Sequence, residues 1–350
     1  MRAHFKFVTA AVMAAVMTTS TLTPSWAQVP APLGVPKPGP VTKGPYAPQP
    51  ILPGGVVMPL FAPGSPYLNA KRVHEAEVYN MDPAVPGRIT SIVNIHNPSI
   101  EVHLSSPTNN TGTAIILVPG GGHNTLNVAG GGADLVPYFF TYGVTTIIIR
   151  SRLRPDGYNP MTDEVYDLQQ AIRMVRSHAA EWRLDPKKVG VLGFSAGAEL
   201  GMAAAIAYDD FDRKNAGDSL SKVSSRPDFV GSIYPGPSLF TKGGKPPIPK
   251  DTPPSFIATP GWGDKVHAVW ANEYFSAMLN AGIPNLEMHV YAIGVHGGGL
   301  NDRGGIAFGT WQNRFIDWFR DLGFLQKPGM PTLAARDVEA FAKQAPKPSP

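Results

Sequence analysis

Six short apolar runs, most of them rich in β-branched residues, constrain the fold of this chain more than any other feature. Runs of this length without polar alternation are typical of strands that are buried on both faces of a sheet. Helical patterns lie between several of them, and this alternation predicts an α/β fold with a mostly parallel, doubly wound sheet over about residues 70–325. The expected strands lie at 113–120, 144–150, 188–194, 228–234, 255–260 and 286–291, and the expected helices at 134–142, 162–181, 196–208, 266–281 and 315–325.

Two segments before the first of these strands alternate apolar and polar residues. They are SIVNIHN (91–97) and SIEVHLS (99–105), separated by an Asn-Pro turn. This pattern predicts an antiparallel pair at the N-terminal edge of the sheet. Thr162 is expected to cap the helix that follows it. The proline-rich and glycine-rich segment 235–254 is expected to be a loop over the end of the sheet where ligands bind.

The first 27 residues have the three parts of a secretory signal peptide. A short positive region (MRAHFKF) precedes an apolar stretch that is too short to span a bilayer, and the small-residue pattern SWA precedes Gln28. We therefore expect cleavage near Ala27 and a secreted or periplasmic protein without a membrane span in its mature chain. An uncleaved membrane anchor is the alternative.

The segments that flank the expected domain differ from it in composition. Residues 28–69 are dense in proline and glycine and are expected to be an extended tether that forms neither a ladder nor a helix, although Val56–Phe61 could pack on the domain surface. Residues 326–350 form a C-terminal tail with one possible further helix. We find no chemistry in this tail.

The composition excludes several classes of protein. None of the 350 residues is cysteine, so the chain has no disulfide framework, no thiolate nucleophile and no cysteine-ligated metal. The formal net charge is +4 and no long basic run is present, which argues against a nucleic acid partner.

Ser195 stands in the sequence GFSAG, which fits the pattern G-x-S-x-G between an expected strand and an expected helix. In this context the serine sits on a sharp turn, and its small neighbours leave room for that turn. The pattern alone is weak because small residues also gather at helix starts for packing reasons. With the strand and the helix in place, it favours a serine nucleophile.

A serine nucleophile needs hydrogen-bond donors for an oxyanion, and the sequence offers two sources. One is the backbone N–H of Ala196, directly after the serine. The other is the segment PGGGH after the strand 113–118, where three glycines allow the backbone to approach a substrate closely. A flexible turn or a phosphate loop is the alternative, but no G-K-[ST] ending follows the glycines.

His296 and Asp264 are the candidates for the base and the acid. His296 lies in a glycine-rich loop after the strand 286–291, and Asp264 lies between the strand 255–260 and the next helix. This gives the chain order Ser, Asp, His. Most of the other histidines lie in expected strands or near helices, as His267 does, where a surface or core position is expected. A cap on the following helix is the alternative role for Asp264.

With these residues in view, the chain resembles the α/β-hydrolase superfamily, and more narrowly the bacterial carbohydrate esterases that include acetylxylan and feruloyl esterases. The segments that carry the resemblance are VPGGGH, AIRMVRSHAAEWRLDPKKVGVLGFSAGAEL, GWGDKVH and VHGGGLNDRGGIAFGTWQNRFIDWFRDLGFL, within about residues 90–325. It implies that Ser195 is the nucleophile and that Asp264 and His296 are its partners. The oxyanion donors that it implies are Gly121, Gly122 and Ala196.

The function expected from these observations is that of a secreted serine esterase, which hydrolyses small acyl esters, acetyl esters first, of a carbohydrate or a similar alcohol. Its partner would be a small-molecule or oligosaccharide ester. No cofactor is required, and no metal is implied because we find no H-E-x-x-H motif or close set of ligands. A general carboxylesterase or lipase-like enzyme and a catalytically inactive binding protein of the same fold are the alternatives. The acyl group, the alcohol and the oligomeric state stay open.

Overall fold

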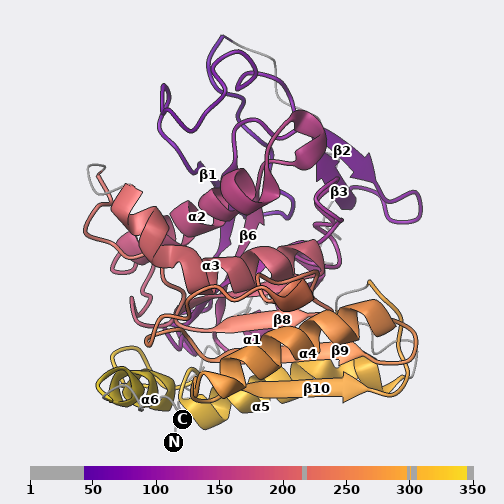
Figure 1. Ribbon diagram of the computed structural model, residues 1–350. Coiled ribbons are helices and arrows are strands. Elements are labelled where there is room, and N and C mark those ends of the chain that lie inside the picture. The colour runs from indigo at the N-terminus through magenta and orange to yellow at the C-terminus, as the bar shows by residue number, and fades with distance from the viewer. Residues whose placement is uncertain (1–42, 215–218, 298–299, 301–305, 345–350) are drawn as a thin grey trace, which may run out of the picture. The chain divides into compact units, whose positions relative to one another are not determined.

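The computed structural model describes residues 43–214, 219–297, 300 and 306–344 (Figure 1). The expected signal peptide lies outside these residues. Within them, one sheet of eight strands has the order β1-β4-β6-β5-β7-β8-β9-β10. The strands are β1 (Val56–Pro59), β4 (Ser99–His103), β5 (Ala114–Val118), β6 (Thr145–Arg150), β7 (Val189–Phe194), β8 (Val230–Ile233), β9 (Ser255–Pro260) and β10 (Glu287–Tyr291).

Six strands of this sheet, β5 to β10, pair in parallel with one another. β4 pairs antiparallel with β6, and β1 pairs antiparallel with β4. The predicted fold class, a mostly parallel sheet with an antiparallel N-terminal edge, is therefore confirmed. The uniformly apolar runs form strands that are buried along their whole length, as β5, β6, β7 and β9 show.

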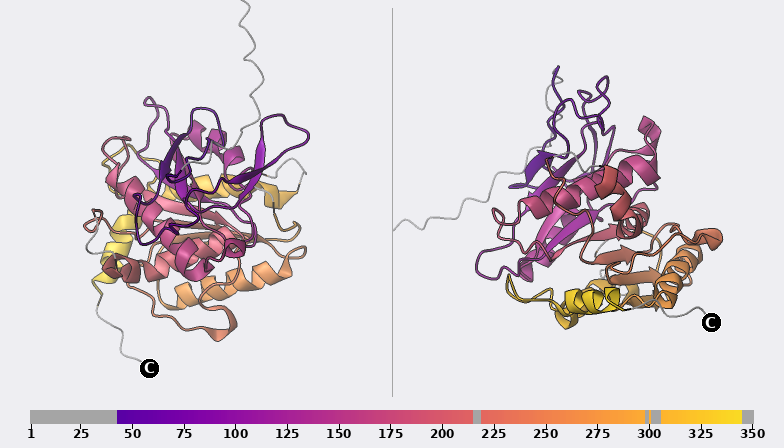
Figure 2. Two further views of the ribbon diagram at one scale, coloured as in Figure 1. Left: turned by 90° about the horizontal axis from the view of Figure 1, so that it is seen from above. Right: turned by 60° about the vertical axis from the view of Figure 1, so that its left-hand side comes forward.

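Helices cover both faces of the sheet because neighbouring residues of each strand point to opposite sides. In β5, Ile115 contacts the cluster that contains Phe139 and Phe315, whereas Ile116 contacts the cluster that contains Leu168. α1 and α5 thus cover one face, and α2, α3 and α4 cover the other (Figure 1, Figure 2). The helices are α1 (Val136–Thr141), α2 (Val165–Ser177), α3 (Ala196–Lys214), α4 (Lys265–Asn280), α5 (Trp311–Leu322) and α6 (Leu333–Ala342).

The two alternating segments that were expected to pair with each other do not do so. The first contributes β3 (Ile89–Val93), which pairs with β2 (Val78–Met81) in a separate two-stranded sheet, and the second contributes β4. Both sides of β4 are occupied, by β1 and by β6, so that no row of backbone groups is left for β3. The connection turns at Asn94, where φ is +60°. The predicted pairing is wrong for this reason.

Part of the expected tether belongs to the sheet. Val56–Pro59 forms β1, and the backbone N–H groups of Ile51 and Leu52 donate hydrogen bonds to the buried carboxylate of Glu101 on β4. The expectation that this stretch forms no ladder is wrong at β1. A four-residue edge strand tolerates the proline at its end because the free side of an edge needs no donor.

Two smaller expectations at the ends of helices had different outcomes. Thr162 does not cap α2, because the helix is preceded by a π-helical turn (Pro160–Glu164) whose cap is Asn159, the side chain of which accepts a hydrogen bond from the N–H of Met161. The possible helix in the C-terminal tail is present as α6. The segment 235–254 is a loop with a single short 3₁₀ turn, as expected.

Candidate active site

Ser195 connects the end of β7 to the start of α3, with a backbone φ of +52°. A positive φ is costly for a residue other than glycine and is typical of functional turns. A β-carbon at Gly193 would lie 2.5 Å from the Cα of Ala198, and one at Gly197 would lie 2.1 Å from the backbone oxygen of Val118. The two glycines of the G-x-S-x-G pattern are therefore required by the close approach of α3 to the sheet.

The structure brings the three residues of the expected triad together at the carboxyl ends of three strands. The hydroxyl of Ser195 lies 2.9 Å from Nε2 of His296, and Nδ1 of His296 lies 2.7 Å from Oδ2 of Asp264. Because a carboxylate only accepts hydrogen bonds, Nδ1 of His296 donates to Asp264 and its Nε2 accepts from the serine hydroxyl. The nitrogen that faces Ser195 is thus in the state that can take up a proton.

Asp264 occupies the N-cap position of α4, but its side chain makes no capping hydrogen bond. Its two oxygens instead contact two imidazoles: Oδ2 contacts His296, and Oδ1 contacts Nδ1 of His267 at 2.5 Å. The carboxylate is buried, with 7% of the residue exposed. The geometry is that of a group that orients histidines, not that of a helix cap.

Two of the three expected oxyanion donors line a cavity that also contains Ser195 and His296. Gly121 and Gly122 line it together with Ser195 and have φ angles of +138° and +62°. A β-carbon at Gly121 would lie 2.0 Å from the backbone oxygen of Thr125, so the loop is closed tightly on itself and leaves no room for a side chain there. As the first residue of α3, Ala196 carries an N–H that has no acceptor within the helix.

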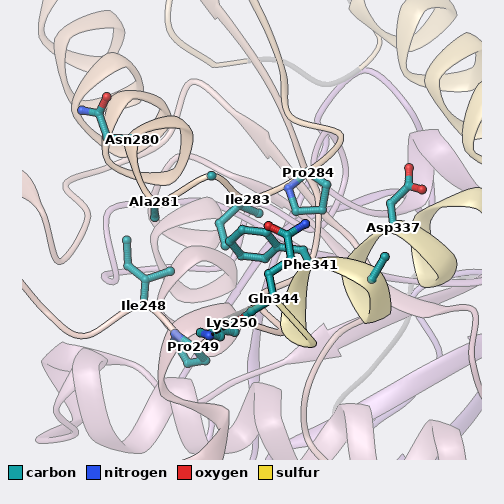
Figure 3. A pocket seen from close by; sticks show the side chains of 12 residues that line it. Ile248, Pro249, Lys250, Asn280, Ala281, Ile283, Pro284, Asp337, Phe341 and Gln344 are labelled. Carbon is teal, nitrogen blue, oxygen red and sulfur yellow. Dashed lines mark hydrogen bonds between the residues drawn. The ribbon is translucent and has the colours of Figure 1, made fainter. Parts of the chain in front are cut away.

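This cavity has a volume of about 420 Å³, and the rings of Tyr234, His267 and His296 form part of its wall. A larger cavity of about 660 Å³ lies between α6 and the end of α4 (Figure 3). Among the described residues that line the larger cavity there is no serine, threonine or histidine. The smaller cavity is therefore the candidate reaction site.

His123 directly follows Gly121 and Gly122 of the expected oxyanion loop and joins this loop to α3, which begins directly after Ser195. Its Nδ1 lies 2.9 Å from Glu164 and its Nε2 lies 3.3 Å from Glu199, which is one turn along α3 from Ser195. Burial lowers the pKa of His123, but the hydrogen bonds and charges of the two glutamates outweigh it and raise the pKa to about 9. A charged imidazolium thus holds the loop against α3.

We expect this imidazolium to make the stability of the protein depend on pH. The folded pKa of about 9 lies above the value of about 6.5 for an unfolded histidine, so the stabilisation is complete below pH 6.5 and is lost as the pH rises to 9, by up to about 1.4 kcal/mol per pH unit. His123→Asn should remove most of this slope, because asparagine is uncharged and tolerates the positive φ of +61°. Urea unfolding of both proteins between pH 6 and 9.5 measures the slopes, and equal slopes would contradict the account.

The sequence reasoning did not place two further histidines at the candidate site. His267, which was expected in a surface or core position, lies in the wall of the reaction cavity. His123 has no role predicted from the sequence, although it ends the segment VPGGGH. The spacing of three residues between Asp264 and His267, at the start of a helix, was a signal for the first, because side chains at this spacing lie on one face. For His123 the signal was Glu199, an acidic residue four positions after Ser195.

The amino-acid sequence is similar to those of known esterases. Residues 100–233, from β4 to β8 with Ser195 included, match the family model described as BD-FAE. An acetylxylan esterase of Xylanibacter ruminicola is 30% identical in an alignment 232 residues long, and the alignment covers 62% of this chain and 46% of the relative. The matched region thus spans less than half the length of that curated relative.

Solved structures are similar over a larger part of the chain. An acetyl ester-xyloside bifunctional hydrolase from Caldicellulosiruptor lactoaceticus has a TM-score of 0.61 at 24% identity, over 79% of this chain and 99% of its own. The thermophilic esterase Est2 of Thermogutta terrifontis has a TM-score of 0.55 at 22% identity, over 67% of this chain and 91% of its own. The predicted α/β-hydrolase fold and the resemblance to its esterases are confirmed. The names of these relatives agree with the expected enzyme class, a carboxylic ester hydrolase.

Proposed function

We propose that the protein hydrolyses small acyl esters through an acyl-enzyme on Ser195. The observation that carries this proposal is the continuous hydrogen-bonded chain from Ser195 through His296 to Asp264, at the wall of a cavity that the oxyanion loop also lines. Oγ of Ser195 attacks the ester carbonyl carbon while its proton passes to Nε2 of His296. Asp264 stabilises the imidazolium that forms.

The remaining steps use His296 and Ser195 again, together with the backbone donors of the oxyanion. The N–H groups of Gly121, Gly122 and Ala196 stabilise the oxyanion of the tetrahedral intermediate. His296 then returns the proton to the oxygen of the leaving alcohol, and the acyl group stays on Ser195. A water molecule that gives its proton to His296 attacks the acyl carbon. The bond from this carbon to Oγ of Ser195 then breaks, His296 returns the proton to Oγ, and the acid is released. No step requires a cofactor.

We further propose that the natural substrates are acetyl esters of carbohydrates. Support comes from the names of two similar proteins, an acetylxylan esterase and an acetyl ester-xyloside hydrolase. A general carboxylesterase that acts on other small esters is the second candidate, because Est2, a protein of similar fold, is named only as an esterase.

A panel of esters tests this proposal. We expect release of acetate from acetylated xylan, and p-nitrophenyl acetate should be hydrolysed faster than p-nitrophenyl octanoate, because the two similar proteins that support the proposal are named for acetyl esters. Faster hydrolysis of the octanoyl ester, without release of acetate from xylan, would favour the second candidate. Absence of all ester hydrolysis would reject both.

We also propose that the protein is exported, with removal of residues 1–27. The succession of charged, apolar and small residues in this segment supports the proposal. Among the described residues, none of the helices has the length and apolar character needed to cross a membrane. The mass of the protein recovered from the periplasm or the medium should correspond to a start at or near Gln28. An exported form that retains Met1 and stays bound to the membrane would support the anchor alternative.

A further inference from the structure

Asp264 accepts hydrogen bonds from two imidazoles, but the proposed mechanism uses only one of them, that of His296. The second belongs to His267, in the first turn of α4, whose Nδ1 lies 2.5 Å from Oδ1 of Asp264. The ring of His267 is stacked on that of His296, with 3.9 Å between the ring centres and 26° between the planes. It also lines the cavity that contains Ser195.

The second nitrogen of His267 is available to a ligand. Because a carboxylate only accepts hydrogen bonds, Nδ1 of His267 carries the proton and Nε2 carries a lone pair. Within the described part of the chain, Nε2 has no hydrogen-bond partner, and it is not among the buried side-chain atoms without partners, so it is open to solvent. A hydrogen-bond acceptor without a protein partner therefore lies at the wall of the reaction cavity.

The surroundings of His267 keep this acceptor neutral. Burial lowers the pKa of His267, the hydrogen bond to Asp264 opposes this shift, and the charge of His296 lowers the pKa further. Trp270 contacts the ring edge-on and carries no charge. When His296 takes the proton of Ser195, the stacked ring beside it resists a second positive charge. His267 therefore stays an acceptor throughout the reaction.

His267 lies beside the place that the alcohol part of a substrate must occupy, not beside the place of the acyl part. His296 returns a proton to the leaving oxygen, so the alcohol must lie beside Nε2 of His296 during the reaction. The carbonyl oxygen is directed instead toward Gly121, Gly122 and Ala196. A ring that is stacked on His296 is thus next to the leaving alcohol.

We propose that His267 is a specificity-determining residue, whose Nε2 accepts a hydrogen bond from a hydroxyl group adjacent to the ester in the alcohol part of the substrate. The substrates that it selects are monoacylated vicinal diols, a class that includes partly acylated sugars. The inference rests on the proposed function and adds a group that distinguishes such esters from those of simple alcohols. A site with an acceptor for a substrate hydroxyl disfavours the analogue that lacks it, because the acceptor is then left unpaired.

Two acetates of nearly equal size test this inference. 2-Hydroxyethyl acetate and propyl acetate form the same acetyl-enzyme and differ only in a terminal hydroxyl or methyl group. We expect kcat/KM of the wild-type protein to be higher for the hydroxyl ester by about 3- to 10-fold, which corresponds to one hydrogen bond. In His267→Asn the amide nitrogen replaces Nδ1 and keeps the contact with Asp264, but nothing replaces Nε2. The ratio should therefore fall to about 1, mostly through KM of the hydroxyl ester.

A second variant and a control make the result unambiguous. His267→Phe keeps a ring on His296 without either nitrogen, and the ratio should fall there as well. His178→Asn is a matched control, because His178 lies on the end of α2 against Trp182 and should leave the ratio unchanged. A ratio that stays at the wild-type value in both His267 variants would overturn the inference, even if both rates fell together. If the wild-type protein hydrolysed neither acetate, the proposed function itself would fail, and the inference with it.

Discussion

Replacement of Ser195 by alanine is expected to lower kcat for ester hydrolysis by about 10⁶-fold, because the acyl-enzyme cannot form without the hydroxyl. The free energy of unfolding should change by less than about 1 kcal/mol, since the methyl group of alanine fits the same turn and has the same conformational cost at a φ of +52°. Steady-state kinetics with p-nitrophenyl acetate and urea unfolding measure the two quantities.

The control for this prediction is Ser177→Ala, a change of the same chemistry at an exposed position of α2. It should leave the rate of hydrolysis within a factor of two. If Ser195→Ala retained a tenth or more of the wild-type rate, Ser195 would not be the nucleophile. A large loss of stability in the same variant would show that the rate reflects unfolding.

Replacement of Asp264 by asparagine should lower kcat by roughly 10²–10⁴-fold. In the wild-type protein, the carboxylate of Asp264 accepts hydrogen bonds from both His267 and His296. An amide has a single oxygen acceptor, and its NH₂ group can only donate, so one of the two imidazoles must adopt the other tautomer or lose its partner. An amide also cannot balance the charge of the imidazolium at His296.

The same substitution distinguishes an orienting acid from a helix cap. Asparagine caps helices about as well as aspartate, so a purely capping role would leave the rate and the stability nearly unchanged. Asp317→Asn, at a partly exposed position of α5, is the matched control and should have no effect on kcat. A near-normal kcat in Asp264→Asn would reject the assigned role.

The central part of the fold was predictable because its signals are local. Each parallel strand is a short apolar run, and its neighbours in the sheet follow from the alternation with helices. Ser195 could be placed for a similar reason, since the glycines on both sides of it are required by the contact of α3 with the sheet. The chain order of Asp264 and His296 then followed from the order of the strands that precede them.

The parts that could not be predicted depend on contacts between distant segments. β1 forms in a proline-rich stretch because β4 offers it a free side, and the N–H groups before it donate to Glu101. β3 pairs with β2 rather than β4 because β6 already occupies the other side of β4. Local patterns carry no information about which side of a strand is already taken.

The two additional histidines of the site show the same limit. His123 is explained only by the meeting of Glu164 and Glu199, which lie in different helical segments. His267 has a local signal in its spacing from Asp264, but its stacking on His296 depends on the loop after β10. Sequence motifs thus identified the residues of the proposed triad, and the structure added two histidines that contact them or the loop beside them.

The most direct test of the central claim is covalent labelling of the folded protein with a fluorophosphonate, followed by mass spectrometry of its peptides. Such probes react with a serine that an adjacent base activates. We predict one adduct per chain, on Ser195 alone, and no adduct in Ser195→Ala. Labelling at another serine, or labelling that persists in Ser195→Ala, would contradict the assignment of Ser195 as the activated nucleophile.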